Sequence, residues 1–315
     1  MNKREEYEKA LKKFENISVS NPITSALIAS SVKRHDKCVH KANCGRLLVV
    51  AGSVGMTGAA IMASKAAMRC GCGLVTLACA KELNTIFEIA LTEVMTCPVS
   101  SSNGVLNHDA KDEIKNRASK ADSVLIGPGL SCSDQIVSLV SELAAECEIP
   151  IILDADGINA LQSNPKILSK AKKPIILTPH IGEFSRLISK TSDEVLKNKE
   201  QLAKEFAQKY NVVLVLKSHE TIVAFPNGAI YRNILGNPGM AKGGSGDVLA
   251  GCIASFVAQT GDAELSALAG VYFHSLASDM AVLETGEYSL IPTDTLNCLK
   301  YAIKETFDDI NGVEE

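Results

Sequence analysis

A glycine-rich segment directly before an apolar helix is the part of this 315-residue sequence best suited to chemistry. It reads Gly-Asn-Pro-Gly-Met-Ala-Lys-Gly-Gly-Ser-Gly-Asp from Gly236 to Asp247, and the apolar run 248–257 follows at once. Glycines let successive backbone N–H groups turn toward one point, and a helix N-terminus adds partial positive charge there. The pattern predicts an anion site suited to the transferring phosphate of a nucleotide. Its candidate phosphate-binding residues are Gly243, Gly244, Ser245 and Gly246.

Asp247 places a carboxylate beside this anion site. Phosphoryl transfer to a hydroxyl needs such a pair, because the backbone holds the phosphate while the carboxylate orients or deprotonates the nucleophile. The alternative is a simple capping or first-turn carboxylate. The density of glycines favours catalysis. The loop lacks the Gly-Lys-Ser/Thr spacing of a Walker A motif, and Gly52-Ser-Val-Gly55 is only weakly similar to a dinucleotide-binding fingerprint.

Two aspartates follow a predicted strand in the segment Leu153-Asp-Ala-Asp156. Parallel α/β sheets bind ligands at the carboxyl ends of their strands. Two interpretations stay open: Asp154 holds Mg2+ through water, or Asp156 merely caps the next helix.

Further polar candidates also have two interpretations each. His180 is a ligand-binding residue or a hydrogen-bonded loop residue. Glu183 is a first-turn carboxylate, which is slightly favoured, or part of a Mg2+–phosphate shell. Lys217 faces a nucleotide, or it extends along apolar surface at a strand end. Asn237 orients phosphate or stabilises a turn, and His274, in an apolar helix, is interpreted as a core histidine.

Short apolar runs alternate with helical patterns from residue 46 onward, which is typical of a parallel sheet covered by helices. The predicted strands are Leu47–Ala51, Leu74–Ala78, Ser123–Ile126, Pro150–Leu153, Pro174–Leu177 and Val212–Leu216, with a hairpin of Thr221–Phe225 and Ala229–Arg232 that turns at Asn227-Gly228. The predicted helices are Gly58–Arg69, Asp109–Ser119, Asp134–Glu146, Asp193–Tyr210 with a Thr191/Glu194 capping box, Gly246–Gln259, Ala263–Leu283 and Thr293–Asp308.

We therefore expect one α/β domain over residues 41–310, with a doubly wound, mostly parallel central sheet and helices on both faces. Residues 1–40 contain too few apolar side chains for a core of their own. They are expected to form an N-terminal helical arm with a charged helix over residues 3–15.

Composition excludes several classes of protein. The formal net charge of -4 and the pI near 5.9 argue against a nucleic-acid-coating surface. No apolar run reaches the roughly 18–20 residues that would span a bilayer, and residues 1–13 lack the apolar core of a signal peptide. We expect a cytoplasmic protein with no membrane or nucleic-acid partner. The ten cysteines are expected to be reduced thiols that act as small hydrophobic residues. Six of them lie in predicted core-facing segments: Cys70, Cys72, Cys79, Cys97, Cys147 and Cys252.

Several motifs resemble, in order, those of the NAD(P)H-hydrate dehydratase family, a branch of the ribokinase-like superfamily. The resemblance covers roughly residues 40–300. The motifs are the segments 40–53, 58–60, 66–75, 126–130 (Ile-Gly-Pro-Gly-Leu), 153–161, 177–183 (Leu-Thr-Pro-His-Ile-Gly-Glu), 216–221 and 236–251. The sequence departs from the family pattern at Met56-Thr57, at Ser131 and at Ala42, the last two being positions where the family has glycine.

The resemblance implies an activity and its partners. The family repairs the S-form of hydrated NADH and NADPH with Mg2+, consuming ADP or ATP and releasing AMP or ADP and phosphate. By resemblance, the hydrated dinucleotide contacts Ala59, Gly129, His180 and Asp247, and the nucleotide contacts Lys217, Ser218, His219, Glu220, Thr221 and Gly246. The resemblance also implies a homotetramer and a form without the family's epimerase domain.

A mechanism follows as a hypothesis. Asp247 takes the proton of the ring hydroxyl, the oxygen attacks the terminal phosphate, and the ring nitrogen then expels phosphate. Two alternatives remain. One is a related kinase acting on a hydroxymethylpyrimidine, thiazole or sugar hydroxyl. The other is a non-catalytic nucleotide sensor.

Overall fold

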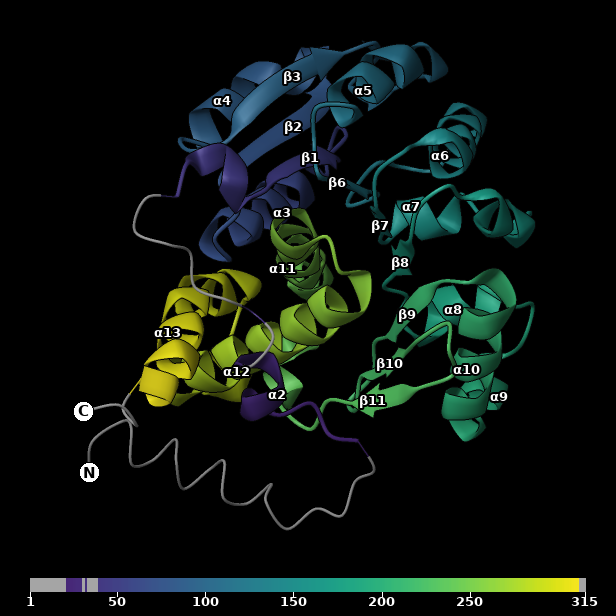
Figure 1. Cartoon of the computed structure of the whole chain (residues 1–315). Coiled ribbons are helices and arrows are strands. Elements are labelled where there is room, and N and C mark those ends of the chain that lie inside the picture. The colour runs from purple at the N-terminus through teal and green to yellow at the C-terminus, as the bar shows by residue number, and fades with distance from the viewer. Residues whose placement is uncertain (1–20, 30–31, 33–38, 312–315) are drawn as a thin grey trace.

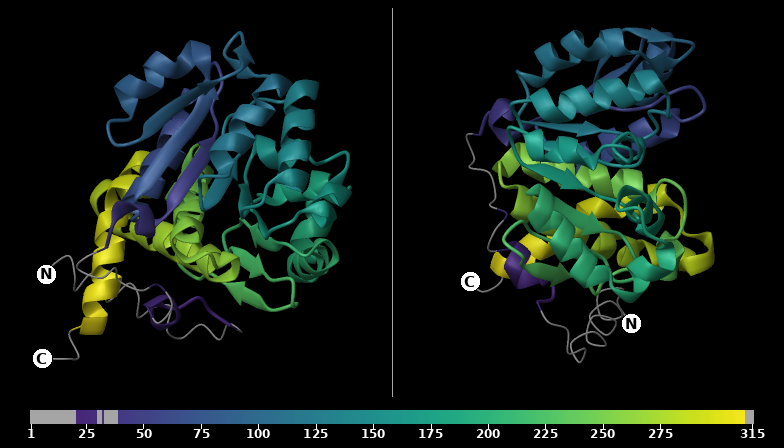
Figure 2. Two further views of the ribbon diagram at one scale, coloured as in Figure 1. Left: turned by 45° about the horizontal axis from the view of Figure 1, so that its top comes forward. Right: turned by 90° about the vertical axis from the view of Figure 1, so that its right-hand side faces the viewer.

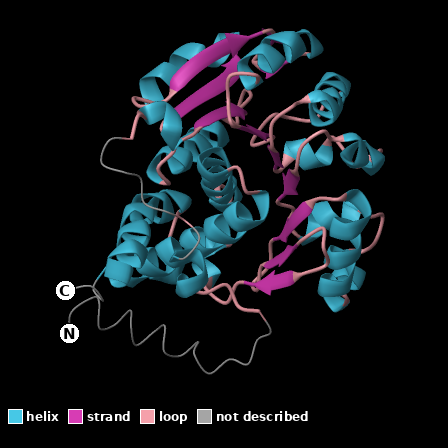
Figure 3. Cartoon of the chain, in the orientation of Figure 1, coloured by secondary structure: helices cyan, strands magenta, loops and turns pink. Residues whose placement is uncertain are grey.

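The computed structural model describes residues 21–29, 32 and 39–311, with side chains described as far as residue 307 (Figure 1). One sheet, ordered β11-β10-β9-β8-β7-β6-β1-β2-β3, runs through this part of the molecule (Figure 3). Its strands are β1 (Arg46–Val50), β2 (Leu74–Ala80), β3 (Met95–Val99), β6 (Ser123–Ile126), β7 (Ile151–Leu153), β8 (Ile175–Leu177), β9 (Val213–Leu216), β10 (Ile222–Ala224) and β11 (Ile230–Arg232). A separate ribbon joins β4 (Ser101–Ser102) to β5 (Val105–Leu106).

Helices cover both faces of the sheet (Figures 1 and 2). α3, α11, α12 and α13 gather on one face, and α5, α6, α8 and α10 lie on the other. The helix bounds are α2 (Ser25–Ala29), α3 (Thr57–Arg69), α4 (Asn84–Ala90), α5 (Lys111–Ala118), α6 (Asp134–Glu146), α7 (Asp156–Asn159), α8 (Ile181–Leu187), α9 (Ser192–Lys197), α10 (Lys199–Tyr210), α11 (Ser245–Thr260), α12 (Ala263–Ser289) and α13 (Pro292–Asn311). Short 3-10 turns are η1 (Lys41–Cys44), η2 (Lys81–Leu83), η3 (His108–Ala110), η4 (Pro165–Lys170) and η5 (Pro238–Met240).

The sheet confirms the predicted doubly wound α/β class. From β9 to β3 every neighbouring pair is parallel, and only the β10–β11 hairpin introduces antiparallel pairs. Strands β1, β6, β7, β8 and β9 are almost wholly buried, as covering by helices on both faces requires. The chain reverses its winding between β1 and β6. Such a switch point opens a crevice at the carboxyl ends of the strands.

The predicted secondary structure needs correction at several places. Helices α4 and α8 were not predicted, and α12 runs to Ser289 instead of ending at Leu283. The single helix predicted over Asp193–Tyr210 is wrong, because α9 and α10 are separated at Asn198, whose φ of -131° is non-helical. The Asn198 side chain bonds to the Glu194 carbonyl, a local alternative to continued helix. The edge strand β3 was not predicted, since Pro98 interrupts its pattern. The Thr191/Glu194 capping box and the hairpin turn at Gly228 (φ +88°) are confirmed.

The described part of the predicted arm packs on the domain. Ile23 donates its N–H to the carbonyl of Arg232 at 2.9 Å, and α2 contacts α12 and α13. Ile28 is fully buried. The helix predicted over residues 3–15 lies outside the described residues, and the 40/41 boundary stays a prediction.

The six cysteines predicted to face the core are all buried, whereas Cys132 is exposed. Within the described chain, no helix has both the length and the apolar character needed to cross a membrane.

Candidate active site

A cleft of about 800 Å3 lies at the carboxyl edge of the sheet, between the glycine-rich loop and the ends of β7 and β9. The loop passes through η5 and turns into α11 at Gly244, which adopts a φ of +101° that glycine tolerates. Among the described residues no side chain caps α11. The Ser245 N–H donates to the Lys242 carbonyl at 3.3 Å, whereas the N–H groups of Gly246 and Asp247 stay available to a ligand. All of Gly243, Gly244, Ser245 and Gly246 line the cleft, as an anion site requires.

Asp247 is the third residue of α11 and also lines the cleft. Burial, reinforced by the nearby carboxylate of Asp154, raises the pKa of Asp247 to about 7, although Lys217 opposes the shift. A carboxylate with this pKa can accept a proton near neutral pH and still bind it firmly enough to assist a reaction. Asp247 lies in the first turn of α11, where a capping carboxylate can also lie, but its raised pKa suits a general base.

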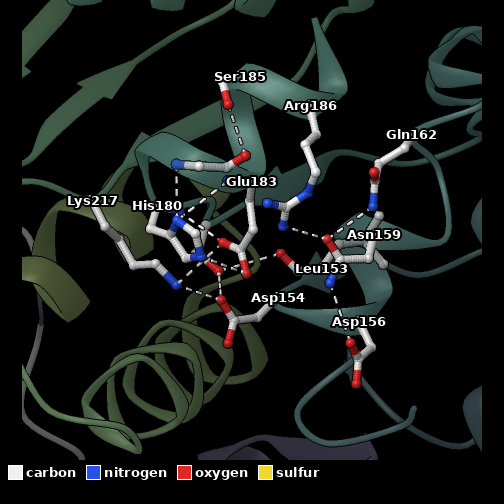
Figure 4. Close-up of polar contacts among 12 residues, drawn as sticks. Leu153, Asp154, Asp156, Asn159, Gln162, His180, Glu183, Ser185, Arg186 and Lys217 are labelled. Atoms are coloured by element: carbon white, nitrogen blue, oxygen red, sulfur yellow. Dashed lines mark hydrogen bonds and ion pairs between the residues drawn. The ribbon is translucent and has the colours of Figure 1, made fainter. Parts of the chain in front are cut away.

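Three adjacent strand ends assemble an ion pair in the floor of the cleft (Figure 4). Asp154 follows β7 and is 1% exposed, and its Oδ1 accepts from Thr178 Oγ1 at 2.6 Å and from Lys217 Nζ at 2.8 Å. Glu183 lies 4.0 Å from the same ammonium. Burial lowers the pKa of Lys217, but the two carboxylates outweigh it and hold the pKa above its ordinary value. Lys217 therefore stays charged, in contact with Asp154 and beside the glycine-rich loop.

The Lys217 ammonium also lies close to the loop. A methyl group built on Gly246 would lie 3.0 Å from Lys217 Nζ and 3.9 Å from Asp154 Oδ2. The ion pair and the start of α11 are thus within reach of one phosphate group.

His180 and Glu183 cap helix α8 reciprocally. His180 Nδ1 accepts from the N–H groups of Gly182 and Glu183, and Glu183 Oε2 accepts from the His180 N–H at 2.7 Å. These bonds confirm the first-turn interpretation of Glu183. They also make Nδ1 an acceptor, so the proton of the neutral imidazole sits on Nε2. His180 lines the cleft.

Asp156 begins α7 and is held away from the ion pair. Its carboxylate accepts from the Ser131 N–H at 2.8 Å and from Asn159 Nδ2 at 3.2 Å. The capping interpretation of Asp156 is wrong, because the N-cap of α7 is Ala155 and no side chain makes a cap hydrogen bond there. The Asp156 carboxylate instead holds the loop at Ser131, and Asp154 is the aspartate that faces the cleft.

Ala59 and Gly129 meet at the switch point between β1 and β6. A methyl group on Gly129, whose φ is +64°, would lie 2.8 Å from the Met56 carbonyl oxygen and 3.1 Å from the Ala59 side chain. Neither residue lines the 800 Å3 cleft. Met62 connects the two regions, since a methyl group on Gly244 would lie 2.6 Å from its terminal carbon. Helix α3 therefore packs against both the switch point, through Ala59, and the glycine-rich loop, through Met62.

The segment 217–221 divides between the cleft and the surface. Lys217, Ser218, His219 and Thr221 line the cleft. Glu220 is not among the lining residues, and it pairs with Lys199 of α10 at 3.4 Å. Ser218 Oγ donates to the Glu220 carbonyl, which fixes the turn.

Asn237 lines the cleft but directs its amide into the protein. Its Nδ2 donates to Asp279 Oδ1 at 2.8 Å and to Ser278 Oγ at 3.2 Å, while Oδ1 accepts from the Gly239 N–H. These contacts favour the turn interpretation over direct phosphate binding. The nucleotide role of Asn237 stays a prediction.

Helix α12 contributes residues to the site that were not predicted; Val271 and Ser275 line the cleft, and two others make polar contacts there. His274 is buried, as expected of a core histidine, yet it lines the cleft with Nε2 3.4 Å from Ser245 Oγ. Burial lowers its pKa to about 4, so it is neutral at pH 7. Asp279 is the other residue, through its contact with Asn237. Helix α12 is apolar on nearly every side, so no periodicity marks the face it turns to the cleft.

Comparison with known proteins is consistent with this geometry. A family model described as NAD(P)H-hydrate dehydratase matches residues 47–300. A bifunctional NAD(P)H-hydrate repair enzyme of Moorella thermoacetica is 36% identical over 92% of the chain, and the chain spans 55% of that relative. The chain thus spans about half the length of the first curated relatives it matches.

Solved structures of NAD(P)H-hydrate dehydratase and ribokinase-like proteins have a similar fold over most of the chain. The ADP/ATP-dependent NAD(P)H-hydrate dehydratase of Bacillus subtilis, co-crystallised with ATP/Mg2+, superposes with a TM-score of 0.78 at 28% identity, covering 92% of this chain and 100% of that one. A ribokinase-like superfamily protein of Enterococcus faecalis gives 0.77 at 26% identity, covering 92% and 98%.

Proposed function

Because the chain belongs to the NAD(P)H-hydrate dehydratase family, we propose that it uses ADP or ATP to dehydrate the S-form of hydrated NADH and NADPH. The observation that carries the proposal is the pairing of an uncapped helix start with a carboxylate of pKa about 7. The first can hold a terminal phosphate, and the second can take the proton of a hydroxyl. The resulting activity is repair of nicotinamide nucleotides.

The reaction divides among the described residues. Asp247 accepts the proton of the ring hydroxyl, and the freed oxygen attacks the terminal phosphorus while the bond to the departing AMP or ADP breaks. The ring nitrogen then expels inorganic phosphate, and loss of a proton from the adjacent ring carbon restores the dihydropyridine. The protein's contribution is to hold the oxygen, the phosphorus and the base in line.

We assign the nucleotide to the cleft and the hydrated dinucleotide to the region reaching from Asp247 and His180 toward Ala59 and Gly129. Gly243, Gly244 and Gly246 would donate N–H groups to the terminal phosphate, and Lys217 would add a charge-assisted bond. The Ser245 N–H is already bonded to the Lys242 carbonyl, so this residue would contribute its hydroxyl. The Glu220 side chain pairs with Lys199, so only its backbone is suited to a nucleotide contact.

The cleft also suits Mg2+. Asp154 Oδ2 has no hydrogen-bond donor among the described residues, and it points to the side of the loop where a phosphate would lie. Mg2+ is commonly held by one or two carboxylates together with phosphates and water, so the absence of a cluster of three ligating side chains in the described chain is compatible with it. Asp154 would hold the ion, directly or through water, and Glu183 would add negative charge behind Lys217. When bound, Mg2+ neutralises charge on the phosphates.

An absorbance assay tests the proposal. Hydrated NADH is mixed with the protein, Mg2+ and either ADP or ATP, and the near-ultraviolet absorbance of the dihydronicotinamide ring is followed. We expect recovery with at least one nucleotide and no recovery when nucleotide is omitted. Absence of recovery, with phosphorylation of a hydroxymethylpyrimidine, thiazole or sugar alcohol instead, would establish the kinase alternative. Tight nucleotide binding without turnover would establish the sensor.

The homotetramer implied by the family resemblance stays a prediction. Light scattering coupled to size-exclusion chromatography tests it, since four copies of a 33.5 kDa chain are easily distinguished from one or two.

A further inference from the structure

The glycine-rich loop is fastened to helix α12 at three points. At its start, Asp279 accepts from the Gly236 N–H at 2.9 Å and from Asn237 Nδ2 at 2.8 Å. In its middle, Lys242 Nζ donates to the carbonyls of Tyr288 and Leu290 at the end of α12. At its end, Ser245 lies against His274. Helix α12 therefore holds the loop along its whole length.

The first of these fastenings determines the path of the loop. Gly236 has a φ of +111°, a conformation that glycine adopts without a steric penalty, and its N–H donates to Asp279 Oδ2 at 2.9 Å. Asn237, which Asp279 orients, in turn fixes the next part of the loop, because its Oδ1 accepts from the Gly239 N–H and caps η5. One carboxylate thus fixes the turn that leads into the phosphate-binding residues.

We propose that Asp279 is a positioning residue for phosphoryl transfer: its carboxylate fixes Gly236 and Asn237, and through them the free N–H groups among residues 243–246 that face the nucleotide. This inference rests on the proposed function and adds a residue that touches neither substrate.

The donor and acceptor pattern explains why a carboxylate is needed. Both groups that face Asp279 are donors, and only an ionised carboxyl group offers them two acceptors. D279N would place its amide NH2 against the NH2 of Asn237 or the N–H of Gly236. N237D would place two carboxylates against each other. Either substitution leaves partly buried groups without a partner.

Exchanging the two residues restores the pattern. In the double variant N237D/D279N, the amide introduced at position 279 can donate to the carboxylate introduced at 237 and accept from the Gly236 N–H. The carboxylate at 237 can still accept from the Gly239 N–H. The pair is therefore a natural double-mutant cycle, in which restored function reports direct coupling.

The experiment measures KM and kcat for ADP, the ADP dissociation constant by calorimetry, and Tm, for the wild type, both single variants and the double variant. We expect each single variant to raise the KM and the dissociation constant for ADP by about tenfold or more, and the double variant to return within about threefold of wild type. D262A is the matched control, because Asp262 caps the opposite end of α12, so Tm falls while the ADP constants stay unchanged.

Three results would overturn the inference. They are single variants whose ADP constants stay within twofold of wild type, a double variant as impaired as the worse single, or a D262A control that raises KM equally. If a single variant is obtained only unfolded, the double variant decides: a folded protein with near-wild-type KM supports the pairing, and an unfolded or equally impaired one refutes it. Failure of the proposed function would show instead in the wild type, as absence of dehydration despite ADP binding.

Discussion

Two cavities lie at opposite edges of the sheet, and each receives the first turn of a long helix. The 800 Å3 cleft at the carboxyl edge receives α11, and a cavity of about 620 Å3 at the amino edge receives α12. In the first, Gly244 precedes the helix and leaves its N–H groups uncapped. In the second, Asp262 accepts from the Leu265 N–H at 3.0 Å. A helix start therefore presents uncapped N–H groups at one edge, and it is capped by an acidic side chain at the other.

The charged side chains differ in the same way. At the carboxyl edge Lys217 pairs with Asp154, which is 1% exposed, beside a carboxylate whose pKa is raised to about 7. At the amino edge Lys172 pairs with Glu148, whose side chain is 78% exposed. Lysines lie at both cavities. The carboxyl-edge cleft differs in that it has uncapped helix N–H groups and a buried carboxylate, which are the features that the proposed reaction needs.

The largest effect is expected from Asp247. D247N keeps the shape of the side chain but cannot accept the hydroxyl proton, so kcat should fall by about 10²- to 10⁴-fold. ADP binding should change little, because the loop N–H groups remain. The absorbance assay and calorimetry together check this, and an active D247N enzyme would remove the base role.

Lys217 comes next. K217M removes a phosphate-facing charge and leaves Asp154 buried without its partner, so kcat/KM should fall by about tenfold or more. Because Lys217 lowers the pKa of Asp247, the acidic limb of the pH–rate profile should also move to higher pH. K172M, at the other cavity, is the matched control and should leave both unchanged.

A loss of fold in K217M must be separated from a loss of function. K217M/D154N removes the uncompensated carboxylate, so it should regain Tm without regaining activity. Recovery of activity in this double variant would show that neither charge takes part in the reaction.

The raised pKa of Asp247 also predicts a stability effect with a definite sign. Between the ordinary pKa of 3.8 and about 7, the unfolded chain loses this proton while the folded protein keeps it. The wild type should therefore lose stability, relative to D247N, as pH rises through this window, and the difference should level off above pH 7. Parallel melting curves of the two proteins at several pH values test this, and a constant difference would contradict the raised pKa.

A smaller effect is expected at the amino edge. D262A removes the cap of α12 and should cost about 1 kcal/mol of unfolding free energy. It should not make the amino-edge cavity bind ADP, because in the part of the chain that the structure describes neither a glycine-rich loop nor a buried cation lies at that helix end. Denaturant unfolding and ADP calorimetry check the two parts separately.

The smallest effect is expected at Ser131, a position where the family pattern has glycine. Its φ of +73° lies in the left-handed region, which is strained for a residue with a Cβ atom. S131G should stabilise the protein by about 0.5 kcal/mol, since relief of strain is partly offset by the greater freedom of glycine when unfolded. Its N–H bond to Asp156 should persist. A lower Tm in S131G would show that the serine side chain stabilises the turn.

Much of the frame was predictable because its signals are local. β6 and α6 begin and end where predicted, since an apolar run defines the strand and Ser133 caps the helix. The strand-end residues Asp154, His180 and Lys217 were predictable because parallel strands bring their carboxyl ends to one edge.

What escaped prediction depends on contacts distant in sequence. Asn237 and Asp279 are 42 residues apart, and no local pattern indicates that they bond. His274 lies in an apolar helix whose composition hides the face turned to the cleft. The split at Asn198 and the edge strand β3 were missed because a single residue, Asn198 or Pro98, decides each of them.

The central claim is that the uncapped start of α11 grips the terminal phosphoryl group of the nucleotide. A crystal structure with a non-hydrolysable ADP or ATP analogue tests it most directly. We predict the terminal phosphate within hydrogen-bond distance of the free N–H groups among residues 243–246, with the Asp247 carboxylate facing it. A phosphate bound elsewhere, for example against Lys172 and Lys173 at the opposite edge, would contradict the account.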